Sequence, residues 1–293
     1  MRLKMYLIQK KTADMTPREL IRQTACRFQQ AGIPDPQADS ALLLSHLTGR
    51  MPLELTLDTD THLSPEMLEA YENLVLARLT RKPLQYMMKE AFFYRRCFFV
   101  DERVLIPRPE TELLCEWALE LISSKQSPHV LDVCCGSGCI GLSIKAEKPD
   151  TKIILSDISA DALDVSRINA KRLSLSAGFH QGDLLDDFQS SDFDMIVANP
   201  PYIPSDACND LQEEVLMEPR LALDGGRDGM SFYRRLIAQA PACLKKGGIL
   251  IMEIGYDQGL SVMQLLESSG YHSVALRKDY QGLDRITMGI YNP

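Results

Sequence analysis

The stretch VLDVCCGSGCIG, residues 130–141, constrains the fold of this chain more than any other. An apolar run typical of a buried strand leads into a loop in which Gly136, Gly138 and Gly141 match GxGxxG, and a helical pattern follows. Glycines allow a tight turn and let a ligand approach the backbone, and the next helix offers free N–H groups at its N-terminus. Strand, glycine loop and helix in this order predict a mostly parallel sheet covered by helices.

The rest of the chain after Pro128 continues this alternation of short apolar segments and helical segments. The later segments that we expect to be strands are FDMIVAN, GGILIMEIG, HSVALRKD and RITMGIY. The last two are separated by too few residues for a crossover helix. We therefore expect the final pair of strands to be antiparallel.

The first part of the chain has a different sequence pattern, with apolar residues at helical spacing up to about residue 85. Thr16 with Glu19 three residues later predicts a capped helix start, and Asp35 and Ser64 each precede a proline at a first helical position. The stretch AFFYRRCFFVDERVLIPRPE predicts a β-hairpin between the helical part and the α/β part of the chain. The expected division is a helical domain over residues 1–85, a hairpin linker over 86–109 and an α/β domain over 110–293.

Charge and composition narrow the classes of partner. The net charge is −8, with +1 over residues 1–90 and −9 over the remainder. This balance disfavours a protein that grips nucleic acid non-specifically, so no direct nucleic-acid contact is expected. The sequence has neither a run of about 18 apolar residues nor a secretory signal pattern, so we expect a cytoplasmic protein that does not enter a membrane. The eight cysteines lack zinc-site spacing, which predicts reduced thiols and no metal.

An acid follows the glycine loop at a distance typical of ribose binding. Asp157 ends the next expected strand, nineteen residues after Gly138. NAD and S-adenosylmethionine both carry a ribose. Asp132 lies in the strand end, where it can hold the loop or meet the positively charged amino group of a methionine moiety. This residue and the antiparallel last pair of strands favour S-adenosylmethionine over NAD.

The stretch VANPPY ends the fourth expected strand of the α/β part, so Asn199 faces the same crevice as the glycine loop. The Asn199 side chain and the Pro200 carbonyl offer acceptors for the two hydrogens of a planar NH2 group, and Tyr202 can lie against its face. Acceptors that strengthen as the nitrogen becomes positive favour methyl transfer to an amide or to the exocyclic amine of a base. Protein-amide methylation, nucleic-acid N-methylation and a catalytically silent binding module all remain open on this evidence.

The chain resembles the release-factor glutamine N5-methyltransferase family (HemK/PrmC type), class I S-adenosylmethionine-dependent methyltransferases, over nearly its whole length. The resemblance rests on VLIPRPETELL, VLDVCCGSGCIGLSI, SDISADAL, IVANPPYI, EPRLALDGGRDGMSFYRRLI and LKKGGILIMEIGYDQG. It implies an α/β fold: a Rossmann-like sheet of seven strands with a helical N-terminal domain and a linking β-hairpin. It also implies methylation of the glutamine in the Gly-Gly-Gln motif of peptide-chain release factors, with S-adenosylhomocysteine as product. A ribosomal-protein glutamine is the alternative protein target.

The resemblance also implies roles for particular residues. The cofactor-binding residues would be Asp132, Cys134, Cys135, Gly136, Ser137, Gly138, Asp157, Asp183, Leu184 and Asn199. The substrate-binding residues would be Asn199, Pro200, Pro201 and Tyr202, of which Asn199, Pro200 and Tyr202 would be catalytic. We expect the protein to act as a monomer on a release factor.

Two positions of the expected cofactor site depart from the family pattern, as do Lys89 and Arg96 in the hairpin, where family members often have glycine. Cys134 replaces the first loop glycine, and Leu184 replaces an aromatic residue that often lines the adenine pocket. Arg108 and Glu110 are expected either to brace the active-site loop or to open a helix. The segment 203–229 is long for a loop, so we expect it to be a lid or a docking segment.

Overall fold

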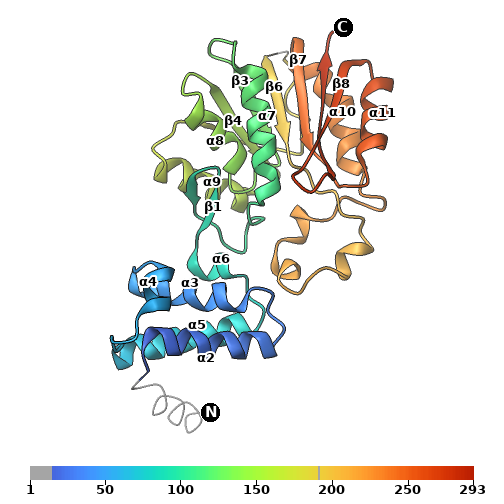
Figure 1. The fold of residues 1–293 in the computed structure, drawn as a ribbon. Coiled ribbons are helices and arrows are strands. Elements are labelled where there is room, and N and C mark those ends of the chain that lie inside the picture. Colours follow the sequence, from blue (N-terminus) through green and yellow to red (C-terminus); the bar gives the residue numbers. More distant parts are fainter. Residues whose placement is uncertain (1–14, 191) are drawn as a thin grey trace. The chain divides into compact units, whose positions relative to one another are not determined.

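The computed structural model describes residues 15–190 and 192–293, and the chain divides into two compact units between Met88 and Lys89. The first unit is helical (Figure 1). Its helices are α2 (Pro17–Gln30), α3 (Pro36–Thr48), α4 (Pro52–Leu57), α5 (Pro65–Leu79) and α6 (Leu84–Met88).

The first helix of this unit begins as its sequence predicts. The Glu19 N–H donates to the Thr16 hydroxyl at 3.4 Å, and the Thr16 N–H donates to the Glu19 carboxylate at 3.0 Å. The Ser64 hydroxyl caps α5 by accepting from the Met67 N–H at 3.3 Å, whereas Asp35 makes no side-chain capping bond. These caps satisfy backbone donors that a helix start leaves unpaired, so the helix starts follow from local sequence.

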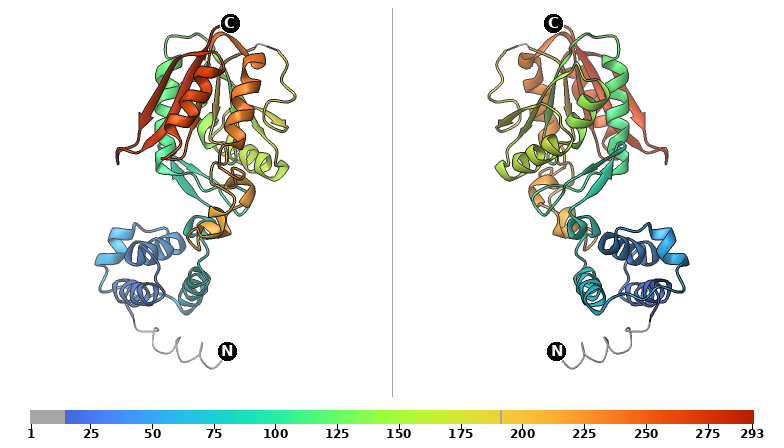
Figure 2. Two further views of the ribbon diagram at one scale, coloured as in Figure 1. Left: turned by 90° about the vertical axis from the view of Figure 1, so that its right-hand side faces the viewer. Right: turned by 90° about the vertical axis from the view of Figure 1, so that its left-hand side faces the viewer.

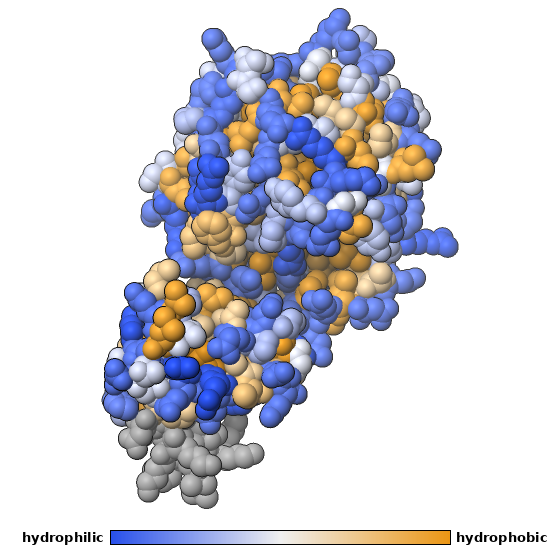
Figure 3. All heavy atoms as spheres, viewed as in Figure 1, coloured by the Kyte–Doolittle hydropathy of each residue, from blue (hydrophilic) through white to orange (hydrophobic). Residues whose placement is uncertain are grey.

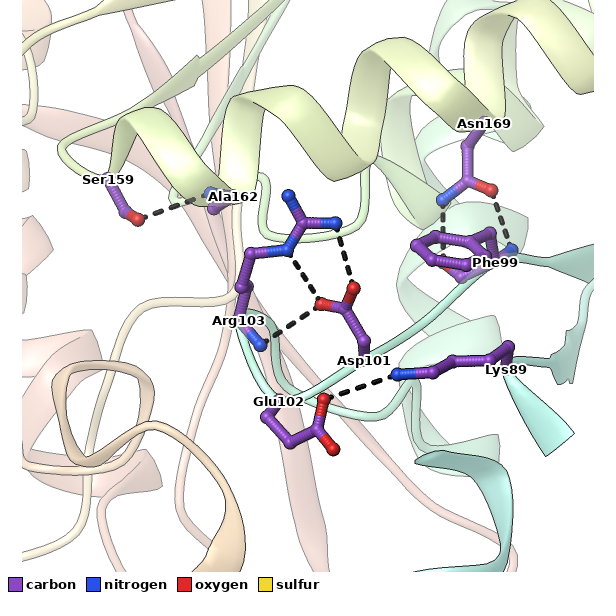
Figure 4. A network of polar contacts seen from close by, with 8 residues as sticks. All are labelled: Lys89, Phe99, Asp101, Glu102, Arg103, Ser159, Ala162 and Asn169. Atoms are coloured by element: carbon purple, nitrogen blue, oxygen red, sulfur yellow. Dashed lines mark hydrogen bonds and ion pairs between the residues drawn. The ribbon is translucent and has the colours of Figure 1, made fainter. Parts of the chain in front are cut away.

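The second unit begins with the predicted hairpin, which is shorter than expected. Strands β1 (Ala91–Phe93) and β2 (Arg96–Phe98) pair antiparallel. Pairing ends at Phe99 because the Asn169 side chain takes both backbone groups of that residue: its Oδ1 accepts from the Phe99 N–H at 2.6 Å and its Nδ2 donates to the Phe99 carbonyl at 2.9 Å (Figure 4). The following residues therefore form a loop rather than a longer hairpin.

The core of the second unit is a seven-stranded sheet, as the family resemblance implies. The strands are β3 (His129–Val133), β4 (Lys152–Asp157), β5 (Gly178–Gln181), β6 (Phe193–Ala198), β7 (Leu244–Glu253), β8 (Tyr271–Lys278) and β9 (Asp284–Tyr291). Their order is β5-β4-β3-β6-β7-β9-β8. The first five are parallel, and β9 is antiparallel to both β7 and β8, which confirms the expected antiparallel final pair.

Helices cover both faces of this sheet (Figures 1 and 2). Side chains such as Val130 and Met195 pack with α7 (Glu112–Ile122), α8 (Cys139–Glu147) and α9 (Ala160–Arg172). Their sequence neighbours Leu131 and Ile196 point to the other face and pack with α10 (Ser231–Cys243) and α11 (Gly259–Ser268). Successive side chains of a strand alternate between faces, so strands buried on both sides read as the continuous apolar runs seen in the sequence.

On the face shown in Figure 3, hydrophilic side chains predominate, with apolar residues scattered among them. Among the residues described, no helix is both long enough and apolar enough to cross a membrane.

Candidate functional site

The site begins with the glycine loop between β3 and α8. Cys134, Gly136 and Gly138 all have left-handed backbone angles, with φ of 58°, 53° and 77°. A side chain at Gly138 would meet Ser166 Cβ at 3.0 Å. Left-handed geometry favours glycine, so Cys134 adopts a backbone conformation that glycine takes with less strain.

Asp132 holds this loop from below. It is fully buried, and its Oδ2 accepts from the Gly141 N–H at 2.8 Å. A Cβ at Gly141 would lie 2.9 Å from the same oxygen, so the third glycine lets α8 approach the strand. Burial raises the pKa of Asp132 to about 8, opposed by the bond from Gly141. Asp132 is not among the residues that line the adjoining cavity, and its bond to Gly141 joins the end of β3 to α8.

Asp157 joins the end of β4 to the glycine loop. Its Oδ2 accepts from the Gly136 N–H at 2.9 Å, and its Oδ1 accepts from the Ser159 N–H at 3.0 Å. Burial raises its pKa above the ordinary value. The carboxylate lines the cavity, and two bonds leave acceptor capacity for further donors because a carboxylate has about four lone-pair sites.

The loop and the strand ends surround a cavity of about 260 Å³. Eight of the expected cofactor-site residues line it: Cys134, Cys135, Gly136, Ser137, Asp157, Asp183, Leu184 and Asn199. Gly138 and Asp132 lie behind this wall. The Asp183 carboxylate pairs with Arg235 at 2.9 Å, so its charge is already partnered.

Several residues that line this cavity were not identified from the sequence, and three of them carry an aromatic ring or a charge. Phe232 and Arg235 come from the start of α10, and Arg103 from the loop after the hairpin. Arg103 forms two bonds to the Asp101 carboxylate beside the start of α9, at 2.9 and 2.8 Å (Figure 4). Phe232 supplies an aromatic ring to the same cavity wall as Leu184.

A second cavity, of about 340 Å³, lies beside the first. Pro200, Tyr202 and Glu253 line it, together with side chains of the segment 203–229. The two cavities share four residues: Leu105, Arg108, Asn199 and Ala222. Asn199, directly after β6, therefore stands where a ligand in one cavity would meet a ligand in the other.

The side chains of the NPPY stretch are held by two partners that the sequence analysis did not identify. The Asn199 Nδ2 donates to the Thr111 hydroxyl at 3.4 Å, and the Tyr202 hydroxyl donates to Glu253 Oε1 at 3.4 Å. Burial raises the pKa of Tyr202, so its phenol is neutral. Glu253 ends β7 beside Asn199. Like Asn199 it is a polar residue at the end of a buried strand, so the same sequence signal could have identified it.

The segment 203–229 folds back onto the NPPY stretch. The Ile203 N–H donates to the Leu223 carbonyl at 3.0 Å, and the Gly225 N–H donates to the Ile203 carbonyl at 2.8 Å. A Cβ at Gly225 would lie 2.7 Å from Tyr202 Cα, so only glycine allows this approach. The segment also carries three short 3-10 helices: η2 (Ala207–Asn209), η3 (Val215–Met217) and η4 (Arg220–Ala222).

Glu218 fixes the middle of this segment to the loop that precedes η1 (Pro109–Thr111). It is buried, its Oε2 accepts from the Ile106 N–H at 3.0 Å, and its Oε1 accepts from Arg108 at 2.5 Å. Both expectations for the RPETE stretch thus describe part of the structure. Arg108 bonds to Glu218 of the segment 203–229, and the next residues form the helical turn η1. The segment 203–229 walls both cavities as a result.

The burial of Asp132 predicts a pH dependence of stability. Between about pH 4 and pH 8 the folded protein keeps the Asp132 proton, whereas the unfolded chain loses it. Stability therefore falls as pH rises through this window, by at most about 1.4 kcal/mol per pH unit from this group. Chemical denaturation of Asp132→Asn, compared with the original protein, should show a difference in unfolding free energy that grows in favour of the variant from pH 4 to pH 8. A constant difference would mean that Asp132 is ionised in the folded state.

Both parts of the chain match known protein families. Residues 19–88 match the family model "PrmC N-terminal domain", and residues 111–228 match "Methyltransferase small domain". A release factor glutamine methyltransferase from Chlorobaculum tepidum is 42% identical over 279 residues, covering 91% of this chain and 94% of the relative. One from Caulobacter vibrioides is 37% identical, covering 91% and 93%.

Solved structures of low identity share the fold. A methyltransferase from Pyrococcus furiosus has a TM-score of 0.50 at 14% identity, covering 67% of this chain and 89% of its own. The hMettl16 catalytic domain, solved in complex with MAT2A 3'UTR hairpin 1, has a TM-score of 0.54 at 13% identity, covering 80% and 85%. These two support the fold alone. The identity and coverage of the curated relatives show that the chain belongs to the release factor glutamine methyltransferase family.

Proposed function

We propose that this protein transfers a methyl group from S-adenosylmethionine to the side-chain amide nitrogen of the glutamine in the Gly-Gly-Gln motif of peptide-chain release factors. The observation that carries the proposal is the position of Asn199, which lines two adjoining cavities at once. Methyl transfer needs the donor and the acceptor in line more than it needs acid–base groups. A shared residue between two cavities suits that requirement.

The first cavity fits the methyl donor. Asp157 retains acceptor capacity for ribose hydroxyls, the glycine loop brings backbone close to the ligand, and apolar walls from Leu184 and Phe232 suit an adenine ring. When bound, S-adenosylmethionine supplies an electrophilic methyl group on a sulfonium. The Asp183 carboxylate already forms an ion pair with Arg235. We therefore assign to Asp183 only the acceptance of a hydrogen bond from the adenine amine.

The second cavity fits the amide. In this proposal Asn199 Oδ1 and the Pro200 carbonyl accept the two amide hydrogens, and Tyr202 covers the face of the planar group. Pro201 lines the first cavity. These acceptors interact more strongly as the nitrogen becomes positive, so they stabilise the transition state more than the bound substrate. The weak nucleophilicity of an amide is what makes this assistance necessary.

We assign docking of the protein substrate to the helical unit. It leaves Met51, Leu53 and Leu57 at the short helix α4 between 66% and 69% exposed. A cluster of exposed apolar side chains suits contact with another protein better than contact with nucleic acid. The excess negative charge of residues 91–293 also argues against nucleic acid as the substrate.

The direct test is mass spectrometry of a release factor incubated with this protein and S-adenosylmethionine. We expect the peptide that contains Gly-Gly-Gln to gain one methyl group on its glutamine, and a release factor with that glutamine replaced to gain none. DNA, RNA and ribosomal proteins serve as competing substrates in the same assay. Methylation of one of these, with the release factor unmodified, would overturn the proposal.

Cofactor binding should depend on Asp157. Asp157→Ala removes the proposed ribose acceptor and should weaken binding of S-adenosylhomocysteine by about 1–3 kcal/mol, measured by calorimetry. Asp161→Ala, an exposed acid at the start of α9, removes the same charge nearby and should bind normally. NAD should give no response with any of the three proteins. Binding of NAD in place of S-adenosylhomocysteine would show that the glycine loop serves a different ligand.

Turnover should depend on Asn199 far more than cofactor binding does. Asn199→Ala removes one acceptor at the reacting nitrogen, so kcat should fall about 10²–10³-fold, as for loss of one preorganised polar group. The affinity for S-adenosylhomocysteine should change little. Asn209→Ala, in the exposed part of the segment 203–229, is the matched control and should keep full kcat. Full turnover by Asn199→Ala would leave Asn199 no role beyond ending a strand.

A further inference from the structure

Three elements converge behind the NPPY stretch through a chain of hydrogen bonds. The Asn199 Nδ2 donates to the Thr111 hydroxyl at 3.4 Å, and the Tyr202 hydroxyl donates to Glu253 Oε1 at 3.4 Å. Burial raises the pKa of Glu253, and a side-chain hydrogen bond from Thr111 lowers it. Thr111 and Glu253 are 2% and 1% exposed. Of the side chains assigned to substrate contact, Tyr202 thus bonds directly to the buried Glu253 carboxylate, and Asn199 is linked to it through Thr111.

We propose that Thr111 and Glu253 are positioning residues that set which end of the Asn199 amide faces the substrate. The inference rests on the proposed function, in which the oxygen of that amide receives an N–H of the glutamine side chain. It adds the reason why the oxygen, and not the nitrogen, is the end presented.

The direction of the chain follows from counting protons. A carboxylate is only an acceptor, and a threonine hydroxyl has one proton to donate. The Thr111 hydrogen bond lowers the pKa of Glu253, as a donor to the ionised carboxylate does, and the Thr111 oxygen accepts from Asn199 Nδ2. An acceptor at this point selects the NH2 end of Asn199. The Oδ1 of Asn199 is then the end left for a ligand in the cavities that this residue lines.

The opposite orientation of the amide would defeat the site. It would set the NH2 of Asn199 against the NH2 of the substrate, so that two donors would face each other and no side-chain acceptor would remain for the reacting nitrogen. An isolated asparagine has no strong preference between its two orientations, since the oxygen and nitrogen ends are nearly the same size. The preference has to come from a neighbour of fixed polarity, and Thr111 has that polarity because of Glu253.

The surroundings of Glu253 support a positional role. The carboxylate lines the second cavity, and its Oε2 is buried with no hydrogen-bond partner among the described residues. Burial raises its pKa, while Thr111, Arg285 and Tyr202 each lower it. A buried carboxylate is unfavourable unless donors compensate it. The two hydroxyl donors at this one are those of Thr111, next to Asn199, and of Tyr202 itself.

The test compares two substitutions of nearly equal size. Thr111→Val replaces the hydroxyl by a methyl group, and Thr111→Ser keeps the hydroxyl. With release factor as substrate, Thr111→Val should lower kcat about tenfold, the scale of one neutral hydrogen bond, with little change in affinity for S-adenosylhomocysteine. Thr111→Ser should recover most of the lost kcat. Equal losses in the two variants would show that packing, and not the hydroxyl, matters here.

A double-mutant cycle separates positioning from general damage. In the Asn199→Ala background no amide remains to be oriented, so Thr111→Val should cause no further loss of kcat. Glu253→Gln should behave like Thr111→Val in both backgrounds, because a glutamine amide can donate to Thr111 and leave its proton free to point at Asn199. An unchanged tenfold loss in the Asn199→Ala background would overturn the inference. Melting temperatures of all the variants identify any that fail to fold.

A readout without substrate keeps this inference separate from the proposed function. The side-chain NH2 signal of Asn199, identified by its disappearance in Asn199→Ala, is followed by NMR in protein labelled at asparagine. One of its two protons should exchange slowly in the original protein and in Thr111→Ser, and rapidly in Thr111→Val. Slow exchange in Thr111→Val would refute the positioning role, whichever substrate the enzyme methylates. A release factor that stays unmodified, with these exchange rates as expected, would refute only the proposed function.

Discussion

The parallel pairing of β3 with β4 and β6 is the constraint on which the site depends. Val133 is opposite Ser156 on one side and Ala198 on the other, so all three strands end at the same level. The residues next to Val133, Ser156 and Ala198 in the sequence are Cys134, Asp157 and Asn199, which all line the first cavity. Backbone hydrogen bonds of a buried sheet thus set the spacing between the proposed ribose acceptor and the proposed amide acceptor, and no side chain has to move to bring them together.

The second cavity depends on contacts between distant segments. Glu218 connects the segment 203–229 to the loop before η1 through Ile106 and Arg108, and Gly225 lets the same segment lie against Tyr202. A long irregular segment carries many backbone polar groups, which must find partners when they are buried. Here the carboxylate of Glu218 supplies one such partner. This anchorage gives the cavity its outer wall and explains why Glu218, an acid in a loop, is buried.

Much of this could be predicted from the sequence, because the relevant patterns are short and contiguous. The capping box at Thr16, the glycine loop and the strand end at Asn199 are each read within about a dozen residues. The pairs that escaped prediction join positions far apart in the chain. The Asn169 side chain hydrogen-bonds to Phe99 and so shortens the hairpin, and Arg235 forms an ion pair with Asp183. Neither contact produces a periodic pattern in the sequence. Asp132 was identified from the sequence as a candidate site residue. Its bond to the Gly141 N–H depends on the close approach of α8 to the strand, which Gly141 allows.

The central claim is that the two cavities meet at Asn199 so that an amide in one faces a methyl donor in the other. The most direct measurement is a crystal structure of the protein with S-adenosylhomocysteine and a peptide containing Gly-Gly-Gln. The account predicts the thioether in the first cavity and the glutamine amide in the second, with its nitrogen within hydrogen-bond distance of Asn199 Oδ1 and the Pro200 carbonyl. A glutamine side chain bound away from the second cavity, or an Asn199 amide that presents its nitrogen to the peptide, would contradict it.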